Sequence, residues 1–266
     1  SQSVIRRSPM SQQGHGPAPP AASRIRARCA VWVAILERAR PMGRPAISQK
    51  TEAPRHPAWD VVDRMCDALA FLKACGDREG LVRGPEHDRL LASILISVCP
   101  KMFGATWPRE RAAALKRVGA ENDNTVTAFS ASRNAGKTLF SSMGLAAVHR
   151  GMAVVGFKQL GLAKSLEQAK IGFKEVVRWL GYFPDFTKTT KVSAEVCVVS
   201  LDGSFGAESN VSRMQVRGLN PEALRGLYND FIWVDETDFV PSDVLMATIL
   251  PMIRPRGRAA LFTSSP

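Results

Sequence analysis

The sequence predicts an α/β fold, with a mostly parallel sheet flanked by helices. Short apolar runs, typical of strands buried on both faces, recur between residues 125 and 263, and stretches with helical periodicity separate several of them. Two of these runs end in acidic or hydroxyl side chains, as strands do when their carboxyl ends line a ligand crevice. With 266 residues, 45% of them hydrophobic, the chain can form one sizeable domain and a small appendage.

The positive charge of the chain is concentrated near its start. The formal net charge is +12, and residues 1–58 hold ten Lys and Arg residues but only two acidic ones. This segment is also rich in Pro, Ser and Gln, so we expect a disordered basic arm. A solvated tail is the plainest interpretation, and a transit peptide or an arm that touches nucleic acid are the alternatives.

Residues 59–104 predict a small helical region. Residues 60–75 place apolar side chains at helical spacing and are followed by Gly76, where we expect the helix to end. Residues 86–99 repeat the pattern, and a third, short helix is expected from Pro108, a favoured first-turn residue. We expect these helices to cover one edge of the sheet.

The cysteines and the apolar runs indicate in which kind of cellular compartment the protein works. The five cysteines are odd in number and form no Cys-x-x-Cys pair, which fits a reducing environment. The longest apolar runs, residues 29–36 and 90–99, are too short to cross a bilayer. We therefore expect a soluble protein without a membrane partner.

Residues 125–138 predict a strand that passes into a phosphate-binding loop and then into a helix beginning near Lys137. Such a loop needs a glycine where the chain approaches the phosphates most closely, a Lys that reaches their oxygens, and a hydroxyl for Mg²⁺. Gly136, Lys137 and Thr138 supply these groups at the required spacing. The helix would also point its N-terminal dipole at the phosphates. The residues expected to bind the nucleotide are Ser132, Arg133, Asn134, Ala135, Gly136, Lys137 and Thr138.

The loop pattern alone leaves an alternative open. Ala131 stands where the usual pattern has its first glycine, so the match is imperfect. A solvated helix start with Lys137 on the surface would give the same residues. Two segments further along the chain favour the nucleotide site.

Between the loop and those segments, the sequence predicts a strand, a helix and a hairpin. Residues 152–157 are a continuous apolar run, as in a strand covered on both faces. Residues 162–180 predict a long amphipathic helix closed by Gly181. Residues 191–201 alternate like a strand, and residues 210–216 can return as its antiparallel partner, an insert that can be purely structural.

Residues 231–236 are the first of the two deciding segments. Four apolar residues predict a buried parallel strand, and its carboxyl end would deliver Asp235 and Glu236 into the ligand crevice. One carboxylate can hold Mg²⁺ through its water shell, and its neighbour can orient the water that attacks the γ-phosphate. We give Asp235 the first role and Glu236 the second. An apolar strand ending in acidic residues is common by itself, but its place well beyond Lys137 favours the functional interpretation.

The second deciding segment, residues 258–263, predicts one more buried strand. We expect this strand to lie between the strand before the loop and the strand that ends at Asp235. The hydroxyls of Thr263, Ser264 and Ser265 would then face the γ-phosphate and could sense whether it is present. A polar terminal loop is the alternative.

Three segments in this order resemble the ATPase domain of large terminase subunits, the DNA-packaging motors of tailed phages and herpesvirus-like viruses. They are residues 132–138 with an Arg inside the loop, Leu-Arg-Gly at 224–226 ahead of Val-Asp-Glu at 234–236, and Phe-Thr-Ser-Ser-Pro at 262–266. The combination is specific because P-loop ATPases in general rarely carry all three. The resemblance covers roughly residues 105–266.

The resemblance implies roles for the site residues. Lys137 and Thr138 would bind phosphate and Mg²⁺, and Asp235 would complete the metal site. Glu236 would be the catalytic carboxylate. Arg133 would stabilise transition-state charge, from its own subunit or from a neighbour, as arginine fingers do. A phosphate-facing or surface arginine without an effect on rate is the alternative for Arg133.

The resemblance also implies a RecA-like P-loop NTPase fold and a function. The expected activity is the hydrolysis of Mg²⁺-bound ATP to drive double-stranded DNA into a procapsid, with Thr263, Ser264 and Ser265 coupling hydrolysis to movement. The implied partners are the DNA, the portal, a small terminase subunit and further copies in a ring, inside the host cell. A grip on backbone phosphates would make DNA binding tolerant of sequence and sensitive to salt.

Two other functions stay open, and part of the family pattern is missing. A helicase-like DNA-dependent ATPase would share Lys137, Asp235 and Glu236, although no arginine-rich helicase motif or second lobe is visible. A nucleotide-binding or capsid-docking fragment without turnover is the other possibility. Because the family continues into a metal-dependent nuclease domain and this sequence stops at Pro266, we expect no nuclease chemistry and a truncated product.

Overall fold

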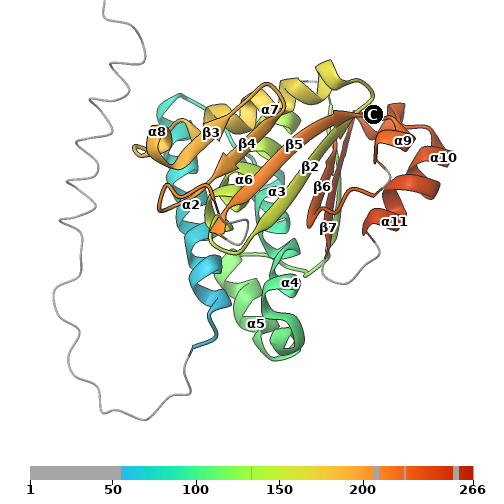
Figure 1. Cartoon of the computed structure of the whole chain (residues 1–266). Helices are drawn as coiled ribbons and strands as arrows, with labels where there is room; N and C mark the ends of the chain where they lie inside the picture. The colour runs from blue at the N-terminus through green and yellow to red at the C-terminus, as the bar shows by residue number, and fades with distance from the viewer. Residues whose placement is uncertain (1–54, 133, 207–209, 225, 254–257, 266) are drawn as a thin grey trace, which may run out of the picture. The chain divides into compact units, whose positions relative to one another are not determined.

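The computed structural model describes residues 55–132, 134–206, 210–224, 226–253 and 258–265 (Figure 1). These residues belong to one compact unit, Ser48–Pro266. The predicted arm therefore lies outside the described residues, apart from residues 55–58. The first described helix begins at Ala58, where the predicted arm ends.

The described chain is built on a seven-stranded sheet with the order β1-β7-β6-β2-β5-β4-β3. The first five strands in this order are parallel, and β4 and β3 join them antiparallel. The mostly parallel α/β fold is therefore confirmed, and so is the predicted place of β7 between β1 and β6. The strands are β1 (Val126–Ser130), β2 (Phe157–Ala163), β3 (Thr190–Val192), β4 (Val196–Val199), β5 (Ser212–Gly218), β6 (Phe231–Val234) and β7 (Ala259–Ser264).

Helices cover both faces of the sheet (Figure 1). On one face α6 and α7 pack together, with α2 and α3 against α6, while the short helices α9, α10 and α11 lie on the other face. The α-helices are α2 (Ala58–Arg78), α3 (Pro85–Ser97), α4 (Cys99–Phe103), α5 (Trp107–Val118), α6 (Lys137–Gly151), α7 (Leu166–Leu180), α8 (Phe186–Thr189), α9 (Pro221–Leu224), α10 (Ser242–Val244) and α11 (Leu250–Ile253). A π-helix (Leu245–Ile249) joins α10 to α11, and two short 3₁₀ turns are η1 (Gly104–Thr106) and η3 (Thr237–Phe239).

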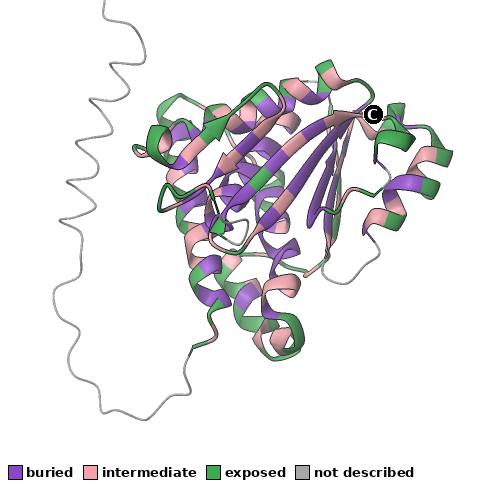
Figure 2. Cartoon of the chain, viewed as in Figure 1, coloured by how far each residue is buried: buried purple, intermediate pink, exposed green. Residues whose placement is uncertain are grey.

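The continuous apolar run of β6 contributes side chains to two separate hydrophobic cores. Because successive side chains of a strand point to opposite faces, Phe231 and Trp233 enter the core under α6 and α7. Ile232 and Val234 enter the smaller core under the short helices. All four are buried. The central strands of the sheet are largely purple, the colour of buried residues, in Figure 2. The sequence pattern of β6 is thus explained by helices on both faces.

The strand predicted at residues 152–157 is wrong. Helix α6 runs on to Gly151, and residues 152–156 form turns, in which Val155 is 46% exposed. Strand β2 begins only at Phe157 and continues to Ala163. Its second and third residues are polar, so its first half does not resemble a buried strand, whereas the apolar turn before it does.

The helix predicted from residue 162 begins four residues too early. Leu162 and Ala163 belong to β2, and α7 begins at Leu166. Ser165 caps it, because its hydroxyl accepts a hydrogen bond from the backbone N–H of Gln168 at 3.3 Å. The predicted end is confirmed, since Gly181 is the C-cap residue.

The predicted hairpin is only partly correct. Residues 191–201 form two short antiparallel strands, β3 and β4, with a turn between them, instead of one strand. Strand β5 does pair antiparallel with β4, as predicted, and it also pairs in parallel with β2. The hairpin is therefore an extension of the main sheet.

The N-terminal helices share the core under α6 and α7 with the sheet. Helix α2 does not end at Gly76 but continues to Arg78, and Gly76 is buried against Leu81, Met143 and Trp179. Small size at that position permits close packing. The helix from Pro108 is confirmed, with the proline in the first turn of α5. Helix α3 contacts the edge strand β1, whereas the main contacts of α2 are with α6.

The helical stretch Pro85–Val118 meets the length and hydropathy of a membrane span. However, 56% of its most apolar window is buried inside the protein, and the stretch is divided into α3, α4, η1 and α5. We interpret it as core helices. Among the described cysteines, Cys66, Cys99 and Cys197 are free thiols.

Candidate nucleotide and magnesium site

Three neighbouring strands end at the same edge of the sheet. Strands β1, β7 and β6 are adjacent and parallel, so the segments that follow them meet at their carboxyl ends. A cavity of about 830 Å³ lies there. It is lined by the loop after β1, the residues after β6 and Ser265, with residues of α7 on a further side. The topology therefore brings all three predicted motifs to one cavity.

The loop between β1 and α6 turns sharply at two residues. Asn134 and Gly136 have φ angles of 69° and 74°, in the left-handed region. A Cβ atom at Gly136 would lie 2.8 Å from the ring of Phe140, so a larger residue does not fit there. Ser132, Asn134 and Gly136, three of the residues expected to bind the nucleotide, line the cavity. Arg133 lies outside the described residues, and its role stays a prediction.

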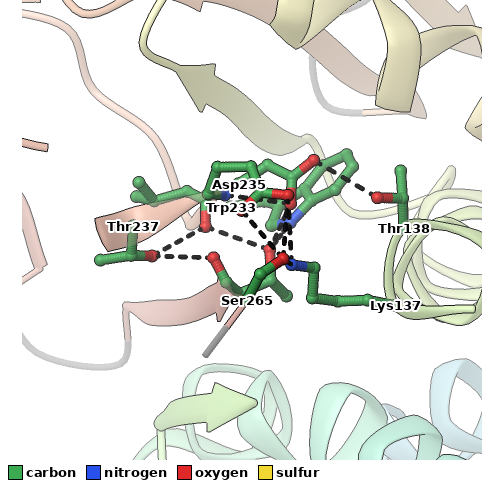
Figure 3. A network of polar contacts seen from close by, with 9 residues as sticks. Lys137, Thr138, Trp233, Asp235, Thr237 and Ser265 are labelled. Carbon is green, nitrogen blue, oxygen red and sulfur yellow. Dashed lines mark hydrogen bonds and ion pairs between the residues drawn. The ribbon is translucent and has the colours of Figure 1, made fainter. Parts of the chain in front are cut away.

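Lys137 is held inside the cavity by two partners. Its side chain is only 7% exposed, and its Nζ donates to Ser265 Oγ at 2.6 Å and to Glu236 Oε1 at 3.2 Å (Figure 3). The alternative of a surface lysine is therefore wrong. The ammonium lies where an anionic ligand of the cavity would meet it.

Thr138, which lines the cavity, faces Asp235, which lies next to it. Thr138 Oγ1 donates to Asp235 Oδ2 at 3.5 Å (Figure 3). Burial is the largest influence on Asp235 and raises its pKa, opposed by the hydrogen bond from Thr263 and by the charge of Lys137. Oxygen donors, one of them a poorly solvated carboxylate, fit a hard cation such as Mg²⁺.

A hydrogen-bonded chain behind Asp235 fixes its orientation. Thr263 Oγ1 donates to Asp235 Oδ1 at 2.6 Å, and the indole Nε1 of Trp233 donates to Thr263 Oγ1 at 3.2 Å. Thr237 Oγ1 donates to the carbonyl of Thr263 at 3.1 Å (Figure 3). The sequence interpretation missed Trp233 and Thr237. A buried indole N–H needs a partner, which is the one signal that could have suggested the role of Trp233.

Glu236 has a strained backbone at the end of β6. Its φ and ψ angles of 52° and 55° are left-handed, which is uncommon for a residue other than glycine and typical of functional sites. Its carboxylate also accepts from Ser265 Oγ, at 3.4 and 3.3 Å. With this backbone conformation, the Glu236 side chain contacts Lys137 in the cavity.

The three hydroxyl residues at the end of β7 are placed differently. Thr263 reaches Asp235, and Ser265 reaches Lys137 and Glu236. Strand alternation directs Ser264 to the opposite face from Thr263. Its backbone carbonyl accepts from Ala131 N–H at 3.2 Å, which ties β7 to the start of the loop.

No protein-family model and no curated protein sequence matches this chain. Its fold is similar to phage large terminase ATPase domains. The ATPase domain of the Thermus phage P74-26 large terminase aligns with a TM-score of 0.45 and 23% identity, over 55% of this chain and 61% of that domain.

Two large terminases from other phages align as well. The bacteriophage HK97 protein has a TM-score of 0.45 and 21% identity, over 59% of this chain and 32% of its own. The large terminase of a thermophilic bacteriophage, in complex with ATP-γ-S, has a TM-score of 0.38 and 14% identity, over 52% of this chain and 32% of its own. The aligned part thus spans about a third of these two proteins. The likeness is one of fold, and the roles of the site residues rest on their own geometry.

Proposed function

We propose that this chain binds Mg²⁺-ATP and hydrolyses it, as the ATPase motor domain of a viral large terminase subunit. One observation carries the proposal: Lys137 and Glu236, separated by 99 residues, form an ion pair in one cavity. Thr138 and Asp235 lie next to each other in the same place. These are the groups that phosphoryl transfer from a nucleotide requires.

Lys137 would be the main phosphate-binding residue. Its ammonium is already paired with one carboxylate, and the oxygens of a triphosphate carry more negative charge than Glu236 offers. Nucleotide binding would therefore replace Glu236 as the partner of Lys137. This exchange frees the Glu236 carboxylate for a second partner, a water molecule in the cavity.

Thr138 and Asp235 would hold the magnesium ion between them. The ion supplies positive charge that stabilises the phosphate oxygens during transfer. Asp235 is kept in place by Thr263 and the residues behind it, so it would hold the ion, through the water shell of the ion, with little rearrangement. Water-excluding burial strengthens this interaction.

Glu236 would act on the attacking water. Its carboxylate accepts a hydrogen bond from that water and orients the oxygen toward the γ-phosphorus. A new bond forms between the water oxygen and phosphorus as the bond from phosphorus to the bridging oxygen of ADP breaks, and the proton of the water leaves through Glu236 to solvent or to the phosphate product. Ser265 contacts both Lys137 and Glu236, so it can respond to the presence of the γ-phosphate.

The motor function is supported by the motif combination, since the loop with Arg133, the Asp235-Glu236 pair and the hydroxyl segment 263–265 together resemble the large terminase pattern. The proposed substrate of the motor is double-stranded DNA, moved into a procapsid through a portal. A small terminase subunit and a ring of copies complete the proposed assembly. DNA contacts are proposed to be to backbone phosphates.

Measured turnover of ATP would test the proposal. Glu236→Gln keeps the shape of the side chain but removes its charge, so nucleotide binding should remain while the rate falls at least about 100-fold. Glu167→Gln makes the same change at an exposed carboxylate of α7 and should leave the rate unchanged. Equal background rates in the wild type and Glu236→Gln would instead favour a nucleotide-binding module without turnover.

A further inference from the structure

His87 joins the N-terminal helices to the phosphate-binding loop. It lies in the first turn of α3, and its Nδ1 accepts a hydrogen bond from the backbone N–H of Gly84 at 2.9 Å. Its Nε2 lies 2.9 Å from the carbonyl oxygen of Ala135, in the middle of the loop. An Nδ1 that accepts carries no proton, so the proton of the neutral ring is on Nε2, which donates to Ala135.

The ring of His87 also supports the helix that follows the loop. It stacks on the ring of Phe140, with the centroids 3.9 Å apart and the planes at 29°. Phe140 is buried, and its ring fills the space where a Cβ atom of Gly136 would lie. His87 therefore contacts the loop through a hydrogen bond and its helix through a stacked ring.

The hydrogen bond to Ala135 determines the direction of the next N–H. The peptide between Ala135 and Gly136 is planar and trans, so its C=O and N–H point in opposite directions. When the carbonyl points toward α3 and His87, the Gly136 N–H points the other way. Gly136 lines the nucleotide cavity, so this N–H is available to an anion there.

We propose that His87 is a positioning residue that holds the phosphate-binding loop in its anion-binding conformation before the nucleotide arrives. The proposal rests on the proposed function, because it concerns the same loop. A loop that is already ordered loses less conformational freedom on binding and binds its ligand more tightly. The role of α3 would then be to set nucleotide affinity.

Two substitutions separate the hydrogen bond from the ring. His87→Phe keeps a ring to stack on Phe140 but removes the donor, and we expect it to weaken binding of Mg²⁺-ADP about tenfold. His87→Gln offers an amide N–H of similar reach, and we expect its affinity within about threefold of the wild type. Titration calorimetry with Mg²⁺-ADP measures both. Amide hydrogen exchange of residues 131–138 without nucleotide should be faster in His87→Phe and near normal in His87→Gln.

His56 provides a matched control. It lies just before α2, accepts a hydrogen bond from the backbone N–H of Ala58 at 3.2 Å and packs on the ring of Phe103, away from the loop. His56→Phe should bind Mg²⁺-ADP like the wild type. Affinity within twofold of the wild type in His87→Phe, or an equal loss in His56→Phe, would overturn the role of His87.

The outcomes also distinguish this proposal from the proposed function. A wild-type protein that binds no Mg²⁺-ADP or Mg²⁺-ATP would refute the proposed function itself. Binding by the wild type with unchanged affinity in His87→Phe would refute only the role of His87. If His87→Phe does not fold, His87→Leu, which also removes the donor, takes its place: a tenfold loss of affinity supports the role, and affinity within twofold of the wild type contradicts it.

Discussion

At Asp235 the proposed metal-binding role and the stability of the nucleotide-free protein oppose each other. Burial raises its pKa, so the folded protein favours the protonated form more than the unfolded chain does. Its contribution to stability is therefore greatest below the ordinary pKa of aspartate and is lost as the pH rises through the raised value. At neutral pH the carboxylate is kept charged at a cost, which a bound cation would offset.

Asp235→Asn should consequently have opposite effects with and without ligand. We expect the free energy of unfolding of the nucleotide-free protein at pH 7.5 to rise by roughly 1 kcal/mol, because a buried and incompletely paired charge is removed. The stabilisation by ADP that depends on Mg²⁺ should disappear. Thermal melts with and without Mg²⁺-ADP measure both effects. Equal Mg²⁺-dependent stabilisation in Asp235→Asn and the wild type would show that the metal is held elsewhere.

The meeting of the candidate site residues was predictable where a local pattern suggests the chemistry. Lys137 and Thr138 follow a loop glycine, and Asp235 and Glu236 follow an apolar strand, so their residue types and positions sufficed. The role of His87 depends on a contact with Ala135, 48 residues away, that no local pattern encodes.

At the level of elements, α7 and β6 meet at a glycine. A Cβ atom at Gly172 would overlap the indole ring of Trp233 and lie 2.6 Å from its Cζ3 atom. The side chain of Trp233 is 2% exposed, and its indole donates to Thr263. The small size of Gly172 therefore lets the helix approach the strand that carries the acidic pair. A larger residue would displace the indole and the hydrogen bonds behind Asp235.

Gly172→Ala should destabilise the protein by about 1–3 kcal/mol, although alanine favours helices, because the buried indole cannot move without strain. The Mg²⁺-dependent affinity for ADP should fall as well. Lys174→Ala, on the exposed side of the same helix, should change stability by less than about 0.5 kcal/mol. Urea unfolding and calorimetry measure the two effects. An unchanged midpoint in Gly172→Ala would mean that the helix and strand are not in close contact.

Helices and strands with a clear sequence signal were predictable, whereas a strand that mixes polar and apolar residues was not. Strand β6 is apolar throughout, and α5 has a proline in its first turn, so both were recognised. Strand β2 begins with the sequence Phe-Lys-Gln, and its polar second and third residues concealed it. The apolar residues before β2 form turns after the end of α6 instead of a strand. Only tertiary packing decides whether such a segment forms a strand or a turn.

For the whole molecule, the place of β7 between β1 and β6 was predictable because the proposed nucleotide site requires it. The expected place of β7 between β1 and β6 brings the polar end of β7 to Lys137 and Glu236. The position of the N-terminal helices was not predictable in the same way. Their apolar residues require a partner, but the sequence does not say that α2 finds it on α6.

The contact between α6 and β5 makes global stability depend on pH. His149 of α6 is fully buried, with its Nδ1 2.5 Å from Ser212 Oγ of β5, and burial lowers its pKa to about 3. An unfolded chain takes up a proton near the ordinary histidine pKa of about 6.5, whereas the folded protein does so only near the lowered value. The stabilisation is therefore complete above pH 6.5 and is lost progressively as the pH falls toward 3.

His149→Gln removes this titration while keeping an amide that can bond to Ser212. Between pH 7.5 and pH 5 the wild type should lose about 2 kcal/mol more of its free energy of unfolding than the variant, since each pH unit below the unfolded pKa costs up to about 1.4 kcal/mol. Urea unfolding at the two pH values measures the difference. His56→Gln, at a partly exposed histidine, should lose as much as the wild type. Equal losses in the wild type and His149→Gln would mean that the imidazole is not held neutral in the core.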